Sequence, residues 1–103
     1  MATKRLARKD ILSALRKHDD ALRRFSVTRI GLFGSYASGR QGPGSDIDFL
    51  VEFEQPTYDN FIGLVAYLEK TFRRKVEVLT PDAVESIRVQ EVAQSIRDSV
   101  VYV

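Results

Sequence analysis

Apolar residues recur at helical spacing in three stretches of the chain. Residues 8–24 and 57–72 each place large apolar side chains on one stripe, which predicts two amphipathic helices. Residues 89–98 are predicted to form a third helix, and Thr80-Pro81 is a helix-start signal upstream of it. Ser35 is expected to start a further, short helix.

Three shorter runs are rich in branched and aromatic residues and read as strands. They are residues 27–34 (VTRIGLFG), 46–53 (DIDFLVEF) and 76–79 (VEVL), and the apolar centre of the second run indicates burial on both faces of a sheet. Residues 39–45 hold three glycines and a proline, which predicts a loop. The mixture of strands and helices predicts an α/β fold.

Length and composition narrow the class of protein. With 103 residues, 44% of them hydrophobic, the chain is expected to form one domain spanning 1–103. The absence of cysteine excludes disulfide frameworks and thiolate zinc sites. A net charge of +2 permits a nucleic-acid partner without requiring one. With no signal peptide and no membrane span in the sequence, a cytoplasmic location is expected.

Asp46 and Asp48 are the first candidates for chemistry. Alternate residues of a strand point to the same side, about 6.6–6.8 Å apart at Cα, so both carboxylates are expected to face one place. Two such charges are costly at neutral pH unless one is protonated or a cation lies between them. Oxygen ligands and the absence of cysteine favour magnesium or manganese over zinc.

Gly34-Ser35, at the end of the preceding strand, is the candidate phosphate-binding turn. Glycine lets the backbone approach a ligand, and amides at a helix start face an anion. If the two strands are neighbours, this turn and the paired aspartates open at the same end of the sheet. A magnesium ion could then bridge a triphosphate to the protein.

A third carboxylate is needed to hold a second metal ion and to accept the proton of an attacking hydroxyl. Glu77 is the candidate, because it lies on the opposite face of its strand from Val76 and Val78. Arg40 and Ser45, at either end of the glycine-rich loop, are further candidates for binding the nucleotide and shaping the turn.

The segment GLFGSYASGRQGPGSDIDFLVEF resembles the signature of the minimal nucleotidyltransferases of the DNA polymerase beta-like superfamily. The resemblance implies a small mixed sheet flanked by helices. It also implies that Gly34 and Ser35 bind ATP and that Asp46, Asp48 and Glu77 hold two Mg²⁺ ions. The sequence departs from the family at Glu77, where aspartate is common, and at Arg40, which follows Gly39 where many relatives have an arginine before that glycine.

Many small proteins of this family resemble antitoxins paired with a HEPN-domain ribonuclease toxin. This implies an enzyme that transfers AMP from ATP to a tyrosine of the toxin, in a complex with it. Two alternatives stay open from the residues alone. One is an antibiotic-type adenylyltransferase acting on a small molecule with a second subunit, and the other is a catalytically inactive module that binds nucleotide or neutralises its partner.

Overall fold

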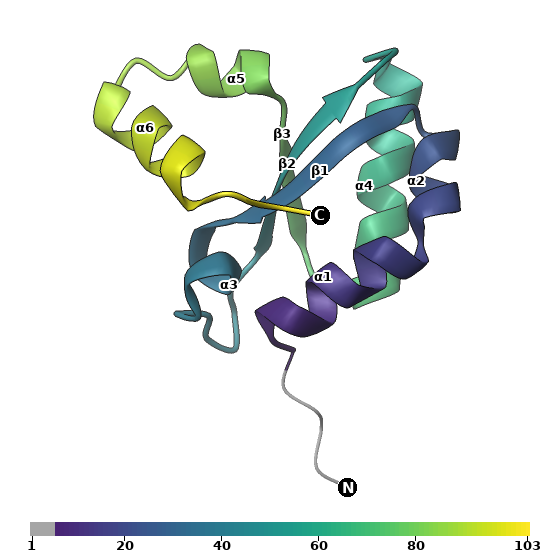
Figure 1. Cartoon of the computed structure of the whole chain (residues 1–103), viewed down its shortest axis with the longest axis horizontal. Coiled ribbons are helices and arrows are strands. Elements are labelled where there is room, and N and C mark those ends of the chain that lie inside the picture. The colour runs from purple at the N-terminus through teal and green to yellow at the C-terminus, as the bar shows by residue number, and fades with distance from the viewer. Residues whose placement is uncertain (1–5) are drawn as a thin grey trace, which may run out of the picture.

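The computed structural model describes residues 6–103, and Figure 1 shows the path of the chain. The helices are α1 (Arg8–Lys17), α2 (Asp19–Arg24), α3 (Gly34–Ser38), α4 (Tyr58–Phe72), α5 (Pro81–Glu85) and α6 (Gln90–Ser99). The strands are β1 (Val27–Phe33), β2 (Ile47–Phe53), β3 (Val76–Leu79) and β4 (Val101–Tyr102). Within residues 6–103 no helix has the length and apolar character needed to cross a bilayer.

The strands form one mixed sheet in the order β3-β2-β1-β4. Strand β1 runs antiparallel to β2 and β4, whereas β2 and β3 are parallel and are joined through α4. A parallel pair needs such a crossover, because a tight turn can only reverse the chain. The predicted α/β fold, a small mixed sheet flanked by helices, is confirmed.

Helices cover both faces of the sheet (Figure 1). Ile47, Phe49 and Val51 of β2 are fully buried and contribute to the larger core, which α1, α2 and α4 complete from one side. Leu50 lies on the other face, in a smaller cluster with Phe33 and with residues of α5 and α6. The predicted burial of this strand on both faces is therefore confirmed, and each face has its own apolar cluster.

The continuous helix predicted for residues 8–24 is wrong, because the chain bends at His18. Helix α1 ends there, with the His18 amide donating to the Ala14 carbonyl (3.0 Å), and α2 begins at Asp19. The His18 ring hydrogen-bonds the Tyr67 hydroxyl of α4 through Nδ1. The apolar spacing gave no sign of this bend, because Leu22, beyond it, still packs into the same core as the apolar residues of α1.

The apolar tail of the chain adds the edge strand β4. Tyr102 pairs with Gly31, and the Val103 amide donates to the Ile30 carbonyl at 3.1 Å. A Cβ at Gly31 would lie 2.6 Å from Cγ2 of Val100 and 2.9 Å from Cδ1 of Tyr102. Gly31 therefore provides the space in which the C-terminal strand packs over β1.

Candidate active site

The end of β1 and the start of β2 lie side by side at one end of the sheet. Phe33, the last residue of β1, is the Cα partner of Asp48 in the antiparallel ladder. Gly34 follows Phe33 directly and opens α3, while Asp46 directly precedes β2. The glycine-serine turn and the paired aspartates thus lie at the same end of the sheet.

Glu77 reaches the same place from the neighbouring strand. It is the Cα partner of Asp48 in the parallel ladder between β2 and β3. Val76 and Val78 on either side of it pack into the larger core, so Glu77 projects from the opposite face, where it is exposed. Asp48 and Glu77 therefore face the same space from adjacent strands.

This arrangement changes the acidity of Asp48. Partial burial, the nearby charge of Glu77 and the nearby charge of Asp46 raise the pKa of Asp48 from 3.8 to about 6, and a hydrogen bond with the Glu77 side chain adds to the increase. Each cause disfavours the ionised carboxylate. Such a perturbed carboxyl, with two further acids near it, is characteristic of a functional site.

Gly34 brings the backbone against the Asp48 carboxylate. Its φ of +74° is unfavourable for any residue with a side chain, and a Cβ there would lie 2.2 Å from Oδ2 of Asp48. The first turn of α3 is consequently held beside this carboxylate. The position requires glycine for two independent reasons, conformation and space.

The acids are suited to a divalent cation, although they do not form a closed metal cage. Across residues 6–103, no three His, Cys, Asp or Glu side chains converge into a ready-made metal site. The side chains of Asp48 and Glu77 are hydrogen-bonded to each other, whereas Asp46 is exposed and affects Asp48 only through its charge. Within the described chain no basic side chain forms an ion pair with these three acids. Unneutralised carboxylate oxygens are the donors that Mg²⁺ and Mn²⁺ prefer.

Ser45 and Arg40 are less closely joined to the acids. Ser45 closes the loop before Asp46, because its Oγ accepts from the Gly42 amide at 2.8 Å and its own amide donates to the Gly42 carbonyl at 3.1 Å. The Arg40 amide donates to the Ser35 carbonyl at 2.9 Å, and its side chain is exposed. Ser45 therefore shapes the turn into Asp46, and the Arg40 side chain lies at the surface.

Sequence reasoning missed one contact that holds the site together. The Tyr36 ring is 3% exposed, and its hydroxyl accepts from Nε of Arg74 at 3.1 Å. The bond connects α3, which begins with the glycine-serine turn, to the segment that leads into β3 and Glu77. No local pattern could have revealed it, because 37 residues separate the two partners in the chain.

Comparison with known proteins agrees with this geometry. Residues 15–103 match the family model of the nucleotidyltransferase domain. The protein adenylyltransferase MntA of Thermococcus cleftensis is 38% identical over 100 residues, which cover 95% of this chain and 97% of that protein.

Two solved structures share the fold. One, described as the "Structure of putative minimal nucleotidyltransferase", superposes with a TM-score of 0.74 at 19% identity and covers 96% of this chain and 98% of its own. The other, a toxin-antitoxin crystallised with AMP-PNP, has a TM-score of 0.61 at 22% identity, covering 94% of this chain and 72% of that chain. Asp48 and Glu77 are paired on adjacent strands beside a glycine turn. Because the sequence also matches the family model over residues 15–103, the chain belongs to the nucleotidyltransferase domain family and has the minimal nucleotidyltransferase fold.

Proposed function

We propose that this nucleotidyltransferase transfers AMP from ATP to a tyrosine hydroxyl of a partner protein, with Asp46, Asp48 and Glu77 as its metal-binding and catalytic acids. The observation that carries the proposal is the pairing of Asp48 and Glu77 on adjacent strands, directly against the backbone of Gly34. On this proposal the pair would hold divalent cations next to a turn that can approach a triphosphate.

The nucleotide would lie along the turn that begins α3. Gly34 and Ser35 would bind the triphosphate through their backbone, with Ser45 supporting the loop and Arg40 free to neutralise phosphate charge. Magnesium, or alternatively manganese, would be held by the three acids as two ions and would supply charge stabilisation for the triphosphate.

The transfer is a substitution at the α-phosphorus. The acceptor oxygen forms a bond to this phosphorus, the bond to the oxygen bridging the α and β phosphates breaks, and pyrophosphate leaves. Glu77 accepts the proton of the acceptor hydroxyl and later releases it to water. Glu77 suits this role because it is the exposed member of the acid pair and lies on β3, one strand further from the turn than Asp48.

The partner we propose is a HEPN-domain ribonuclease toxin. Three observations support a protein acceptor and a toxin: the resemblance of the sequence to antitoxins of this type, the relative named a protein adenylyltransferase, and the fold shared with a toxin-antitoxin structure. AMP on a tyrosine near an RNA-binding site would add negative charge and bulk, and would so oppose RNA binding.

The test is incubation with ATP, Mg²⁺ and the partner toxin, followed by intact mass spectrometry of the toxin. We expect a gain of one or more AMP units that maps to tyrosine and is absent with EDTA. Asp46→Asn combined with Asp48→Asn should abolish the gain, whereas Gly42→Ala, in open space on the nearby loop, should retain it.

Two further measurements, labelling of an aminoglycoside and protection of cells from the toxin, separate the two alternatives. A small-molecule enzyme would label an aminoglycoside and leave the toxin unlabelled. An inactive neutralising module would protect cells from the toxin equally well with both aspartates replaced. Either result would overturn the proposed function.

A further inference from the structure

The short connection between α4 and β3 carries three basic residues in a row. Arg73, Arg74 and Lys75 follow the last residue of α4, and Val76 begins β3. All three basic residues are exposed. Because β3 is parallel to β2, it starts at the end of the sheet opposite α5, where Asp46 leads into β2 (Figure 1). The basic run therefore adjoins the acids of the candidate active site.

Of the three, Lys75 lies on the face of the sheet that carries the acids. The Ile47 amide donates to the Lys75 carbonyl at 3.0 Å, which continues the parallel ladder of β2 and β3. Lys75 is two positions before Glu77, and alternate positions of a strand share a face about 6.6–6.8 Å apart at Cα. Asp46 lies two positions before Asp48 in the same way. Lys75 and Asp46 are thus neighbours across the two strands, at the open end of the site.

The backbone around Lys75 is fixed on both sides. The Arg73 amide donates to the Glu69 carbonyl at 2.8 Å, and the Val76 amide donates to Oε2 of the same glutamate at 3.3 Å. The side chain of Lys75 therefore starts from a fixed point. A binding group on a fixed backbone loses less conformational freedom when it meets its ligand.

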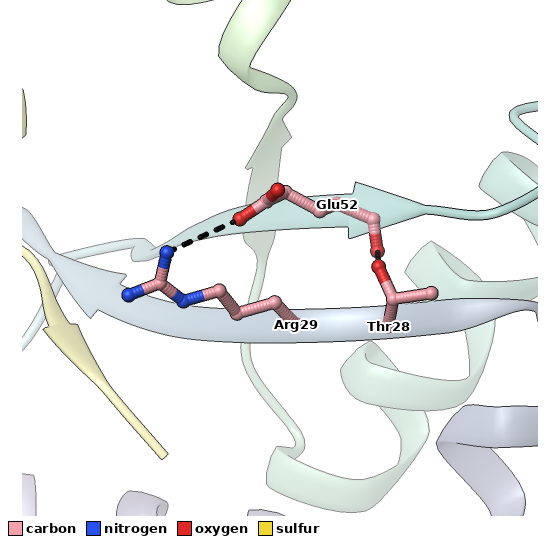
Figure 2. Close-up of polar contacts among 3 residues, drawn as sticks. All are labelled: Thr28, Arg29 and Glu52. Carbon is pink, nitrogen blue, oxygen red and sulfur yellow. Dashed lines mark hydrogen bonds and ion pairs between the residues drawn. The ribbon is translucent and has the colours of Figure 1, made fainter.

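The ammonium of Lys75 has no partner within residues 6–103, where it forms neither an ion pair nor a side-chain hydrogen bond. Other cations of the sheet and its connections do have partners. Figure 2 shows Nη1 of Arg29 paired with Oε2 of Glu52 across β1 and β2 at 3.6 Å. Nε of Arg74 donates to the Tyr36 hydroxyl. The charge of Lys75 is consequently free to bind an anion from outside the chain.

The order of the strands places Lys75 on the acceptor side of the proposed reaction. Gly34 continues from β1, the paired aspartates belong to β2, and Lys75 and Glu77 lie on the far side, at β3. In a substitution at phosphorus the attacking and leaving oxygens lie roughly in line, on opposite sides of the phosphorus. With the triphosphate at the turn of Gly34, the acceptor would arrive from the β3 side. Asp46, Lys75 and Glu77 are all exposed there, so an approaching segment can reach them.

We propose that Lys75 is a specificity-determining residue that binds a carboxylate of the acceptor protein, one or two residues from the modified tyrosine. The inference rests on the proposed function. Two residues of an extended chain span about 7 Å, which matches the separation of Lys75 from Glu77, the proposed proton acceptor. An acidic side chain drawn to Lys75 would bring the tyrosine hydroxyl to Glu77. Complementary charges of this kind select a partner and fix its register.

Peptides with one tyrosine in a glycine-serine background test this preference. Glutamate one or two residues from the tyrosine should lower the peptide KM about 3- to 5-fold relative to glutamine, as one exposed ion pair allows, with unchanged kcat. Lys75→Gln should lose this difference, and Lys75→Arg should keep it. Lys17→Gln, at the exposed end of α1, is the matched control and should also keep it.

Reversing the charge gives the sharper test. Lys75→Glu should reverse the preference, so that a lysine peptide has a KM about 3- to 5-fold lower than the glutamine peptide. A purely structural role of Lys75 would not produce this exchange. The variant should also raise the KM of the partner toxin and leave the KM of ATP unchanged. A raised KM for ATP with an unaltered peptide preference would assign Lys75 to the triphosphate and overturn the proposal.

Binding is measured without transfer by NMR titration in the presence of Mg²⁺, with phenylalanine in place of the tyrosine of each peptide. We expect the glutamate peptide to shift the amide signals of Lys75, Val76 and Glu77, and to bind about 3- to 5-fold more tightly than the glutamine peptide. Equal binding of the two peptides, or shifts confined to other surfaces, would overturn the proposal.

The failure of this inference differs from the failure of the proposed function. If the wild-type protein transfers AMP to no protein or peptide, the proposed function fails, and the titration alone decides whether Lys75 binds an acidic peptide. If transfer occurs and glutamate has no effect on KM at any position, the role of Lys75 fails while the function stands.

Discussion

The backbone of Gly34 and the carboxylate of Asp48 approach each other so closely that no side chain fits between them. With a φ of +74° and only 2.2 Å from the position of a Cβ to Oδ2 of Asp48, Gly34 couples the first turn of α3 to the central acid. This relationship leads to the first prediction.

Gly34→Ala should reduce nucleotidyl transfer at least about 100-fold, because Asp48 must move away from its position beside the turn. It should also lower the free energy of unfolding by about 1–3 kcal/mol, since alanine is strained at this φ. Steady-state kinetics and urea denaturation measure both effects. Gly42→Ala, with nothing within 4 Å of its Cβ, is the control, and equal behaviour of the two variants would contradict the prediction.

Asp48→Asn should stabilise the metal-free protein at pH 8. Because the pKa of Asp48 rises from 3.8 to about 6 on folding, the native state holds this proton longer than the unfolded chain, and stability falls as pH rises between these values. Removing the charge should raise the free energy of unfolding by about 1 kcal/mol above pH 6, after allowance for solvent screening. Below pH 3.8 the variant and the wild-type protein should be equally stable. Thermal unfolding from pH 3 to 8 measures this window.

Added Mg²⁺ should raise the melting temperature of the wild-type protein at pH 8, because a cation between the carboxylates relieves the same repulsion. The increase should be much smaller in Asp48→Asn and at pH 5, where the wild-type acid is largely protonated. An equal increase in both proteins would place the bound ion elsewhere.

Glu77→Gln should slow transfer about 100-fold or more while leaving ATP binding within a few fold, because it removes the proposed proton acceptor. The same change should lower the pKa of Asp48 from about 6, since the charge of Glu77 is the second-largest cause of its elevation. A ¹³C NMR titration of the Asp48 carboxyl reports this shift. An unchanged titration would show that the two side chains do not interact in solution.

Tyr36→Phe should lower the free energy of unfolding by about 1 kcal/mol, the usual value for one hydrogen bond, because Arg74 loses its partner. We also expect slower transfer, since the contact connects α3 with the segment before Glu77. Tyr58→Phe is the matched control, because Tyr58 is 76% exposed. If both variants unfold at the same urea concentration, the Tyr36 contact contributes nothing.

The local pattern of the sequence determined most of the elements and the candidate acids. Alternation placed Glu77 on the face opposite Val76 and Val78, and helical spacing identified α4, because both periods follow from backbone geometry within a few residues. The spacing of Gly34-Ser35 from Asp46 and Asp48 also carried the resemblance to the nucleotidyltransferases, which the family match confirmed.

Only the tertiary structure decided which parts meet. The pairing of Asp48 with Glu77, the bend at His18 against Tyr67, the bond between Tyr36 and Arg74 and the docking of Tyr102 over Gly31 each join residues distant in the chain. Such contacts depend on strand order and on how helices pack against the sheet, and a local period contains no information about either.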